Sequence, residues 1–518
     1  MSMIVQPELG VLSTGDRPWF SASLKRGEIV TAGQARCLLG HRLDSGKYGN
    51  DGLWTEWQWD GTRLTARNDR YGMRPLYYAC TADGIHVSSS ISRVANAVPS
   101  TLDHGALAVF FRLGFFLGED TPFAEVRVLP PGSTLTWERG RLTVERGSIA
   151  IPSAPHPVRS FDEAVDRYGE LFSQSIARRP PPDEDLTVPI SGGRDSRHIL
   201  LELVSQGHRP SLTVTVRSRP PSPNEDVRIA HLLRDELSLA HAEIDMPHSF
   251  AAANLKDLEL TDFCSSGHIW LLPVSAYLKG RTGTVYDGLA GSVLSGGFQV
   301  NEDKLALYRS GKLEQLARML LAESGGMNDF LRTSLQPEFA REIDGDTAIE
   351  RLVTELEKHS DASNPLVSYI FWNRTRRGIS LIPCAILDHI ERVYCPYLDH
   401  DLFDFLINLD VSWTLGNALH DETIRRRYPR YAHIPYENKD APKVQGRTMS
   451  AYYRRAAGGL LAYLAAHPRH FRSRLLRSER VALMAGRDLT RRACAGTWYL
   501  RPALYLLELE RLRDGRGS

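Results

Sequence analysis

The chain has 518 residues, of which 63 are Lys or Arg and 62 are Asp or Glu. A single hydrophobic core rarely serves more than about 250–300 residues, so we expect two domains. The balanced charge excludes a protein-wide field that would attract nucleic acid or an anionic membrane.

The sequence also lacks membrane and export signals. No run approaches the roughly 18–20 apolar residues of a membrane helix, and the first ten residues, MSMIVQPELG, do not form a signal peptide. The six cysteines are scattered, without the short paired spacing that binds zinc or builds a disulfide framework. We therefore expect a cytoplasmic protein with reduced thiols.

The N-terminal third has the pattern of antiparallel strands and turns. From about residue 27 to 147, short apolar runs alternate with Gly, Asp and Asn, and a helix over 102–118 interrupts them. Pro-rich stretches at 151–157 and 178–185 flank an amphipathic helix over 161–176. These stretches mark a domain boundary, which gives domains 1–155 and 156–518.

Beyond the boundary, strands and helices alternate. We expect strands over 186–190, 211–216 and 240–246, and helices over 198–207 and 227–237. Such alternation indicates parallel βαβ units with right-handed crossovers. The remainder, residues 300–518, is predicted to be mostly helical.

A glycine-rich loop joins the first of these strands to the first helix. The loop consists of Ser191, Gly192, Gly193, Arg194, Asp195 and Ser196. Free N–H groups and the positive end of the helix dipole suit a phosphate there, and Asp195 suits a bridging Mg²⁺. The loop lacks the lysine of a Walker-type site. The alternative is a plain strand-to-helix turn with Asp195 in a capping position.

The SGGxDS loop resembles the signature of the N-type ATP pyrophosphatases, and further motifs resemble the asparagine synthetase superfamily. The motifs occur in the family's order: ARNDRYGMRPLYYA (66–79), VSSSISRVANA (87–97), the segment 102–132, NEDVRIAHLL (224–233), DGLAGSVLSGGF (287–298) and CPYLDHDLFDFLINL (395–409). The resemblance implies an α+β N-terminal β-sandwich of the N-terminal-nucleophile type, then an α/β doubly wound ATP-pyrophosphatase domain with a helical C-terminus.

The same resemblance implies ATP and Mg²⁺ as cofactors. It assigns ATP binding to the six loop residues together with Val216 and Gly288, and metal binding to Asp195, with Asp287 as a candidate second ligand. Asp287 stands where relatives usually have Ser, so it could replace a lost carboxylate or be a solvated turn residue.

The sequence departs from the family at several chemical positions. A glutaminase of this type needs a cysteine at position 2 whose amine activates its own thiol, and here the residue is Ser2. Ser292 and Val293 replace an Asp-Glu pair, and Leu289 and Arg392 stand where catalytic groups are expected. Glutamine hydrolysis is therefore not expected.

Two residues are candidates for the missing catalytic groups. Lys443 lies near a family position whose lysine neutralises charge on the adenylate, with Lys439 as a competitor and a plain surface lysine as the alternative. Glu391 is the candidate general base, with Asp388 and Tyr394 nearby. Loop residues Arg194 and Arg197 either reach the substrates or anchor the loop to local acids.

The leading hypothesis is an ATP-dependent ligase that adenylates a carboxylate and forms an amide, in natural-product or peptide tailoring. Its partners would be small-molecule or peptide carboxylate and amine substrates, and we allow for a homodimer. The alternatives are an ammonia-dependent asparagine synthetase and an inactive pseudoenzyme of the family.

Overall fold

The structure is a computed structural model of the whole chain. The residues that it describes are 3–5, 9, 17–43, 51–151, 158–182, 185–219, 222–265, 267–323, 327–438, 440–444, 448–490 and 498–514. Within these ranges, no helix combines the length and apolar character needed to cross a membrane. Five cysteines are free thiols, and Cys494 lies outside the described residues.

Two five-stranded antiparallel sheets form the N-terminal part of the fold. One sheet has the order β3-β2-β8-β7-β9 and the other β11-β10-β6-β5-β4. The bounds are Trp19–Lys25 (β2), Glu28–Gly33 (β3), Arg36–Leu43 (β4), Asp51–Trp59 (β5), Arg63–Asn68 (β6), Tyr77–Thr81 (β7), Gly84–Ser88 (β8), Arg127–Val128 (β9), Thr134–Glu138 (β10) and Arg141–Glu145 (β11). The strand-and-turn prediction is confirmed.

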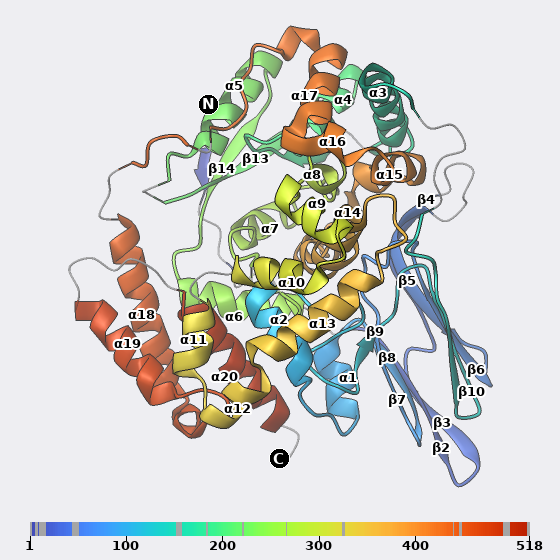
Figure 1. Cartoon of the computed structure of the whole chain (residues 1–518), viewed down its shortest axis with the longest axis vertical. Coiled ribbons are helices and arrows are strands. Elements are labelled where there is room, and N and C mark those ends of the chain that lie inside the picture. Colours follow the sequence, from blue (N-terminus) through green and yellow to red (C-terminus); the bar gives the residue numbers. More distant parts are fainter. Residues whose placement is uncertain are drawn as a thin grey trace.

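The two sheets pack face to face. Alternate residues of each strand point inward, so Leu64 and Ala66 of β6 are fully buried while Arg63 and Arg67 are exposed. One buried cluster joins both sheets, with members Phe20, Ile85 and Val87 from the first and Trp57, Leu64 and Trp137 from the second. This is the expected β-sandwich, at the lower right of Figure 1.

Two helices belong to the same half, α1 (Ile91–Ala97) and α2 (His104–Leu113). The helix predicted over 102–118 ends earlier because Gly114 adopts a left-handed conformation at φ 82° and its N–H donates to the carbonyl of Phe110. That arrangement is a common way for helices to stop.

The second half is built on a parallel sheet of six strands in the order β1-β14-β13-β12-β15-β16. The bounds are Met3–Val5 (β1), Leu186–Pro189 (β12), Leu212–Arg217 (β13), His241–Asp245 (β14), Thr284–Tyr286 (β15) and Arg392–Tyr394 (β16). Every neighbouring pair is parallel. The predicted strands and the α/β alternation are confirmed.

Helices alternate with these strands, and the first three of them confirm the helices predicted over 161–176, 198–207 and 227–237. They are α3 (Phe161–Ala177), α4 (Asp195–Ser205), α5 (Glu225–Leu237), α6 (Phe250–Thr261), α7 (Leu272–Leu278) and α8 (Gly291–Ser295). Helix α4 begins three residues earlier than expected, at Asp195. The loop residue Asp195 is therefore the first residue of the helix.

The strand β1 was not predicted. Residues Met3–Val5 pair in parallel with Ala242, Glu243 and Ile244 of β14, at the edge of the sheet. The chain therefore starts its described path in the sheet of the second half, although these residues fall inside the range 1–155. Figure 1 shows the N-terminal end beside β14, well away from the sandwich.

Residues beyond 300 are mostly helical, as predicted. The α-helices are Glu302–Arg309 (α9), Leu313–Ala322 (α10), Met327–Ser334 (α11), Pro337–Glu342 (α12), Gly345–Glu357 (α13), Pro365–Ile370 (α14), His400–Ile407 (α15), Val411–Thr414 (α16), Ala418–Arg427 (α17), Thr448–Ala466 (α18), Ser478–Thr490 (α19) and Leu500–Asp514 (α20). Two π-helices, η2 (Phe371–Ile379) and η3 (Ile382–Ile386), and short 3₁₀ turns complete this part.

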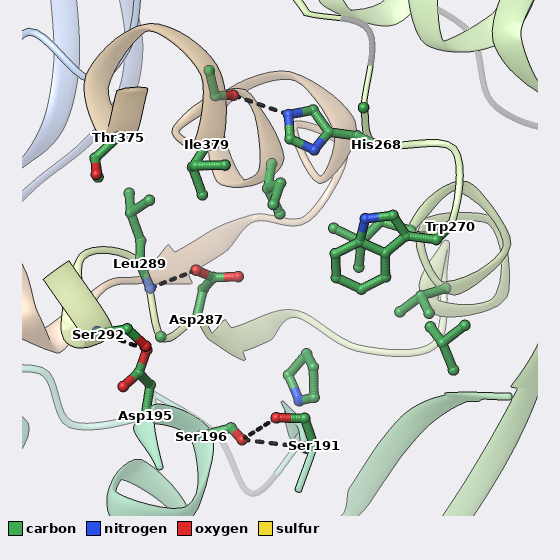
Figure 2. Close-up of a pocket in the computed structure, with 18 of the residues that line it drawn as sticks. Ser191, Asp195, Ser196, His268, Trp270, Asp287, Leu289, Ser292, Thr375 and Ile379 are labelled. Atoms are coloured by element: carbon green, nitrogen blue, oxygen red, sulfur yellow. Dashed lines mark hydrogen bonds between the residues drawn. The ribbon is translucent and has the colours of Figure 1, made fainter. Parts of the chain in front are cut away.

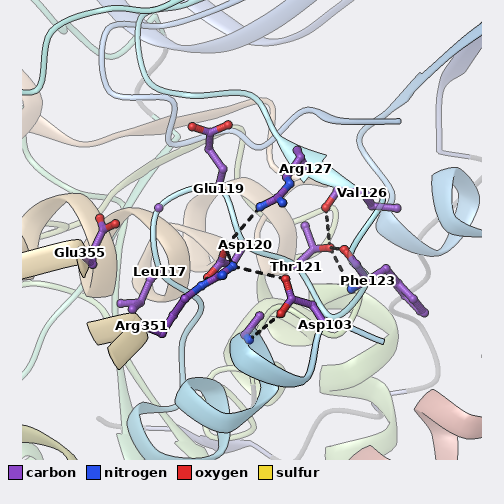
Figure 3. A network of polar contacts seen from close by, with 12 residues as sticks. Asp103, Leu117, Glu119, Asp120, Thr121, Phe123, Val126, Arg127, Arg351 and Glu355 are labelled. Carbon is purple, nitrogen blue, oxygen red and sulfur yellow. Dashed lines mark hydrogen bonds and ion pairs between the residues drawn. The ribbon is translucent and has the colours of Figure 1, made fainter. Parts of the chain in front are cut away.

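Polar contacts join the helical part to the segments on either side of α2. Arg351 of α13 pairs with Asp120 at 2.5 Å and with Asp103 at 3.3 Å, and Arg127 pairs with Asp120 at 3.5 Å (Figure 3). From η2, the buried Arg377 donates to the carbonyls of Gly118 and Asp120. These contacts hold η2 in a fixed position between the two halves.

Candidate functional site

The site lies where the strands β12 and β15 end. These strands are parallel neighbours, and each is followed at once by functional residues. The glycine-rich loop follows β12, and Asp287 follows β15. Ligands of open α/β sheets bind in the crevice outside the carboxyl ends of the strands. The topology therefore brings Asp195 and Asp287 to the same edge.

Hydrogen bonds order the glycine-rich loop internally. The Ser191 N–H donates to Ser196 Oγ at 3.2 Å, and the Gly193 N–H donates to Ser191 Oγ at 3.2 Å. The Gly192 N–H donates to Asp226 Oδ1 of α5 at 2.6 Å. A Cβ at Gly192 would lie 2.6 Å from the Cβ of Glu437, so glycine permits this close approach.

Arg194 and Arg197 anchor the loop. The Arg194 guanidinium pairs with both carboxylate oxygens of Asp421 and lies over the ring of Tyr436 at 4.2 Å. Arg197 is buried, donates to the carbonyls of Ile434 and Pro435, and lies 4.1 Å from the centre of the same ring. Of the two roles expected for these arginines, the contacts favour anchoring.

Asp195 has one oxygen satisfied and one available. Its Oδ2 accepts hydrogen bonds from the Ser292 N–H at 2.9 Å and the Ser292 hydroxyl at 2.6 Å. Its Oδ1 is buried, lies 3.6 Å from His420 Nδ1 and has no hydrogen-bond partner among the described residues. Burial, with a smaller contribution from Asp287, raises the pKa of Asp195 to about 6.

Asp287 is the second carboxylate of the site. Its Oδ1 accepts a hydrogen bond from the Leu289 N–H at 2.8 Å, and burial raises its pKa to about 6. Among the described residues, no group of three or more His, Cys, Asp and Glu side chains forms a metal site. Two carboxylates nevertheless suit Mg²⁺, which is commonly held by one or two carboxylates and the phosphates of its substrate.

A cavity of about 970 Å³ opens from these carboxylates. Figure 2 shows Asp195, Ser196 and Ser191 on its lower side, Asp287 at its centre, and His268 and Trp270 on the opposite wall. The predicted site residues that line it are Ser191, Asp195, Ser196, Val216, Asp287 and Gly288. The structure thus brings together residues from three strand ends.

The two catalytic candidates lie elsewhere. The Lys443 side chain is exposed and does not line the cavity. The Glu391 side chain is 67% exposed and pairs with its neighbour Arg392 at 2.7 Å. Asp388 pairs with Arg74. The geometry therefore gives neither Lys443 nor Glu391 a contact with the cavity, and their catalytic roles stay untested predictions.

Lys439 and Ser2 lie outside the described residues. Gly192, Gly193 and Arg194 belong to the loop but do not line the cavity wall.

Sequence reasoning missed several residues of the cavity wall. His268 and Trp270 come from the segment before α7, Arg374 and Thr375 from η2, and Arg501 from α20. His268 Nε2 lies 3.0 Å from the Gly378 carbonyl oxygen, and burial lowers the pKa of His268 to about 4. Nothing in the sequence marks these positions, because α20 and η2 are distant in the chain and come together only in the fold.

Comparison with known proteins identifies the N-terminal part. Residues 49–146 match the family described as glutamine amidotransferase domain. The chain is related to the asparagine synthetase superfamily and carries a glutaminase-like domain. It is 27% identical over 155 residues to asparagine synthetase [glutamine-hydrolyzing] 3 of Bacillus subtilis (strain 168). That match covers 29% of this chain and 25% of the relative, so it spans only a quarter of the relative's length.

Solved structures add distant likenesses. NMN synthetase from Francisella tularensis is 18% identical, with a TM-score of 0.21, covering 38% of this chain and 93% of that chain. Glutamine phosphoribosylpyrophosphate amidotransferase from B. subtilis, complexed with ADP and GMP, is 14% identical with a TM-score of 0.14, covering 38% of this chain and 48% of that chain. At these scores the likenesses carry no argument about the site.

Proposed function

We propose that this protein is an ATP-dependent ligase that activates a carboxylate as its adenylate and joins it to an amine without using glutamine. The acid would displace pyrophosphate from ATP, and the amine would then displace AMP. The observation that carries the proposal is the SGGRDS loop at the end of a parallel strand, with Asp195 and Asp287 facing one large cavity.

The proposal gives defined roles to residues of this chain. Asp195 and Asp287 would hold Mg²⁺, because Asp195 Oδ1 accepts no hydrogen bond from the described residues and both carboxylates line the cavity. Ser292 fixes Asp195 through two hydrogen bonds. When bound, Mg²⁺ would supply positive charge that stabilises the departing phosphates. Val216 and Gly288, which line the cavity, would contact the bound nucleotide.

Independence from glutamine is supported by the residue at position 2. Residues Met3–Val5 pair with β14 at the edge of the parallel sheet, and they do not join the sandwich. A glutaminase of this type needs a cysteine at position 2, and this chain has a serine there. We therefore propose that the sandwich does not hydrolyse glutamine.

Two other functions are alternatives to the proposed ligase. An ammonia-dependent asparagine synthetase would release AMP only when aspartate is supplied as the acid. A pseudoenzyme is favoured by Leu289, Ser292 and Arg392, which replace the expected catalytic groups, and it would bind no Mg-ATP productively.

The test is a calorimetric titration of Mg-ATP into wild-type protein and the Asp195→Asn variant. Asparagine keeps the shape and the acceptor for Ser292 but removes the charge that would hold Mg²⁺. We expect affinity for Mg-ATP to fall about 10- to 100-fold, as for the loss of one charged interaction. The matched control is Asp329→Asn, an exposed acid on α11, which should bind like wild type. Equal binding by all three proteins, or none by wild type, would contradict the proposal.

A further inference from the structure

The cavity needs a cation to balance a triphosphate, and few residues can provide it. The cationic side chains that line it are Arg374 and Arg501, because Lys443 lies outside the wall and the low pKa of His268 keeps its imidazole neutral. Catalysis of phosphoryl and adenylyl transfer commonly uses such cations to stabilise charge on the departing phosphates. Arg374 and Arg501 are therefore the two candidates for binding an anion in this cavity.

Arg374 differs from the other arginines of its helix. Arg376 donates to the carbonyls of Gly72, Gly118 and Leu129, and Arg377 donates to those of Gly118 and Asp120. The Arg374 guanidinium has no hydrogen bond or ion pair with any residue that the structure describes. The guanidinium carbon lies over the ring of Phe298, 4.5 Å from the ring centre.

A partly buried guanidinium without an acceptor is costly, because charged groups in protein interiors are normally paired. Burial lowers the pKa of Arg374, because the charged form is partly removed from water. An anion bound in the cavity would pair with this charge and offset the cost of burying it. Guanidinium groups bind phosphate oxygens through two parallel hydrogen bonds, which makes phosphate a natural partner.

The neighbouring residue provides an independent second observation. The Thr375 side chain is 1% exposed, its hydroxyl has no hydrogen-bond partner among the described residues, and it lines the same cavity. A buried hydroxyl without a partner is uncommon in native proteins and usually indicates a missing ligand or water. Two adjacent residues of η2 thus present unsatisfied donors to one cavity.

The position of these donors points to the phosphate end of the cavity. Arg374 lies over Phe298, whose N–H donates to the Ser292 carbonyl at 3.1 Å, and Ser292 holds Asp195. Figure 2 shows Thr375 above Leu289 on the side of Ser292, opposite Trp270. The carbonyl of Thr375 accepts the N–H of Ser380, a five-residue spacing typical of π-helices, which are frequent at functional sites.

We infer that Arg374 and Thr375 form the subsite that binds the pyrophosphate portion of ATP. This assignment rests on the proposed function and gives the neutralising role expected of Lys443 to residues of η2. Arg501 is a poorer candidate because its Nε already donates to Asn254 Oδ1 at 3.2 Å.

The experiment measures binding of Mg-pyrophosphate, Mg-ATP and AMP by calorimetry to wild type, Arg374→Met, Thr375→Val, Arg501→Met and Arg318→Met. We expect Arg374→Met to weaken pyrophosphate and ATP about 10- to 100-fold and to leave AMP unchanged, since AMP lacks the displaced phosphates. Thr375→Val should show a smaller loss with the same pattern. Arg501→Met should weaken pyrophosphate less than Arg374→Met does. The matched arginine control is Arg318→Met, at an exposed residue of α10 that pairs with Glu314, and it should bind pyrophosphate like wild type.

The outcomes separate this subsite from the proposed function. Wild type that fails to bind Mg-ATP would overturn both. If wild type binds ATP, and Arg374→Met and Thr375→Val bind pyrophosphate as well as wild type does, only the subsite is overturned. Arg374 would then be a candidate for binding the carboxylate of the acid substrate. An equal loss in Arg501→Met would also overturn the subsite. Melting temperatures establish that each variant is folded, and Thr375→Val keeps the test decisive if Arg374→Met does not fold.

Discussion

Asp195 occupies a space that only very small neighbours leave open. A Cβ on Gly291 would lie 2.5 Å from Asp195 Cγ and 2.8 Å from a ring carbon of Tyr397, and a Cβ on Gly288 would lie 2.8 Å from Asp195 Cβ. Such distances are far shorter than van der Waals contact. A larger residue at either glycine would therefore collide with the Asp195 side chain. The two glycines of the DGLAG segment therefore have a spatial role next to the loop.

Gly291→Ala should consequently impair both stability and binding. The added methyl group must displace Asp195 or Tyr397, and overpacking of this kind costs about 1–3 kcal/mol of the free energy of unfolding. We expect a lower melting temperature and weaker Mg-ATP binding. Gly345→Ala is the matched control, because nothing lies within 4 Å of its added Cβ. Equal melting temperatures for the two variants would contradict this steric argument.

At the same scale, the sequence predicted the loop and its carboxylates better than the catalytic groups. Ser191 and Asp195 belong to the glycine-rich loop that joins β12 to α4, and Asp287 directly follows β15, so their places in the sequence put them at strand ends that face the crevice. Lys443 and Glu391 were proposed by analogy of position alone, and their side chains point to solvent. Exposure depends on the packing of distant segments, which local spacing does not contain.

Among the secondary-structure elements, the β-strands and the alternating helices were predictable because periodicity is a local property. The β6 strand alternates exposed and buried residues, and the β12 strand is a short apolar run followed by a glycine turn. The π-helix η2 was not predictable. Its segment RTRRG suggests an exposed charged face, whereas Arg376 and Arg377 are buried and satisfied by carbonyls from the other half of the chain.

The ion pairs of Arg351 allow a prediction about the contact between α13 and Asp120. Asp120 is 6% exposed, and removal of Arg351 from α13 would leave it with Arg127 as its ion pair. Arg351→Met should lower the free energy of unfolding by about 1–2 kcal/mol, because a buried carboxylate loses its closest donor. Thermal melting measures this.

The comparison variant for Arg351 is Arg318→Met. Arg318 is an exposed residue of α10 that pairs with Glu314 four residues away. Exposed pairs of this kind contribute little, so its melting temperature should stay close to that of wild type. A similar decrease in melting temperature for both variants would show that the contact between Arg351 and Asp120 stabilises the fold no more than an exposed ion pair does.

For the whole molecule, two sets of buried groups respond to pH in opposite directions. Burial raises the pKa of some acids to about 6 or 7, so the folded state loses stability as pH rises from about 4 towards those values. Burial lowers the pKa of some histidines to about 3 or 4, so the folded state gains stability as pH rises towards 6.5. The acids are Asp69, Asp195, Asp257 and Asp287, and the histidines are His41, His241, His268 and His420.

A single variant separates these opposing effects. Asp257 of α6 is fully buried, and burial raises its pKa from 3.8 to about 7 although Arg501 opposes the shift. Between about pH 4 and 7 the folded protein keeps this proton while the unfolded chain has lost it, so stability falls as pH rises. Asp257→Asn removes that dependence. Its melting temperature relative to wild type should rise from pH 4.5 to 7.5.

The control for Asp257 is Asp329→Asn, which carries the same chemical change at an exposed position. Its melting temperature relative to wild type should not depend on pH. A constant difference between Asp257→Asn and wild type over the same range would show that the folded and unfolded states bind the Asp257 proton equally.

The pairing of β1 with β14 has a consequence for how the chain is made. Met3 lies opposite Ala242, 239 residues further along the chain. During synthesis the ribosome delivers this strand long before its partner exists, and the whole sandwich is completed in between. Closing so long a loop makes this edge a late event in folding. The first described strand to leave the ribosome therefore waits, unpaired, until more than half of its own sheet has been translated.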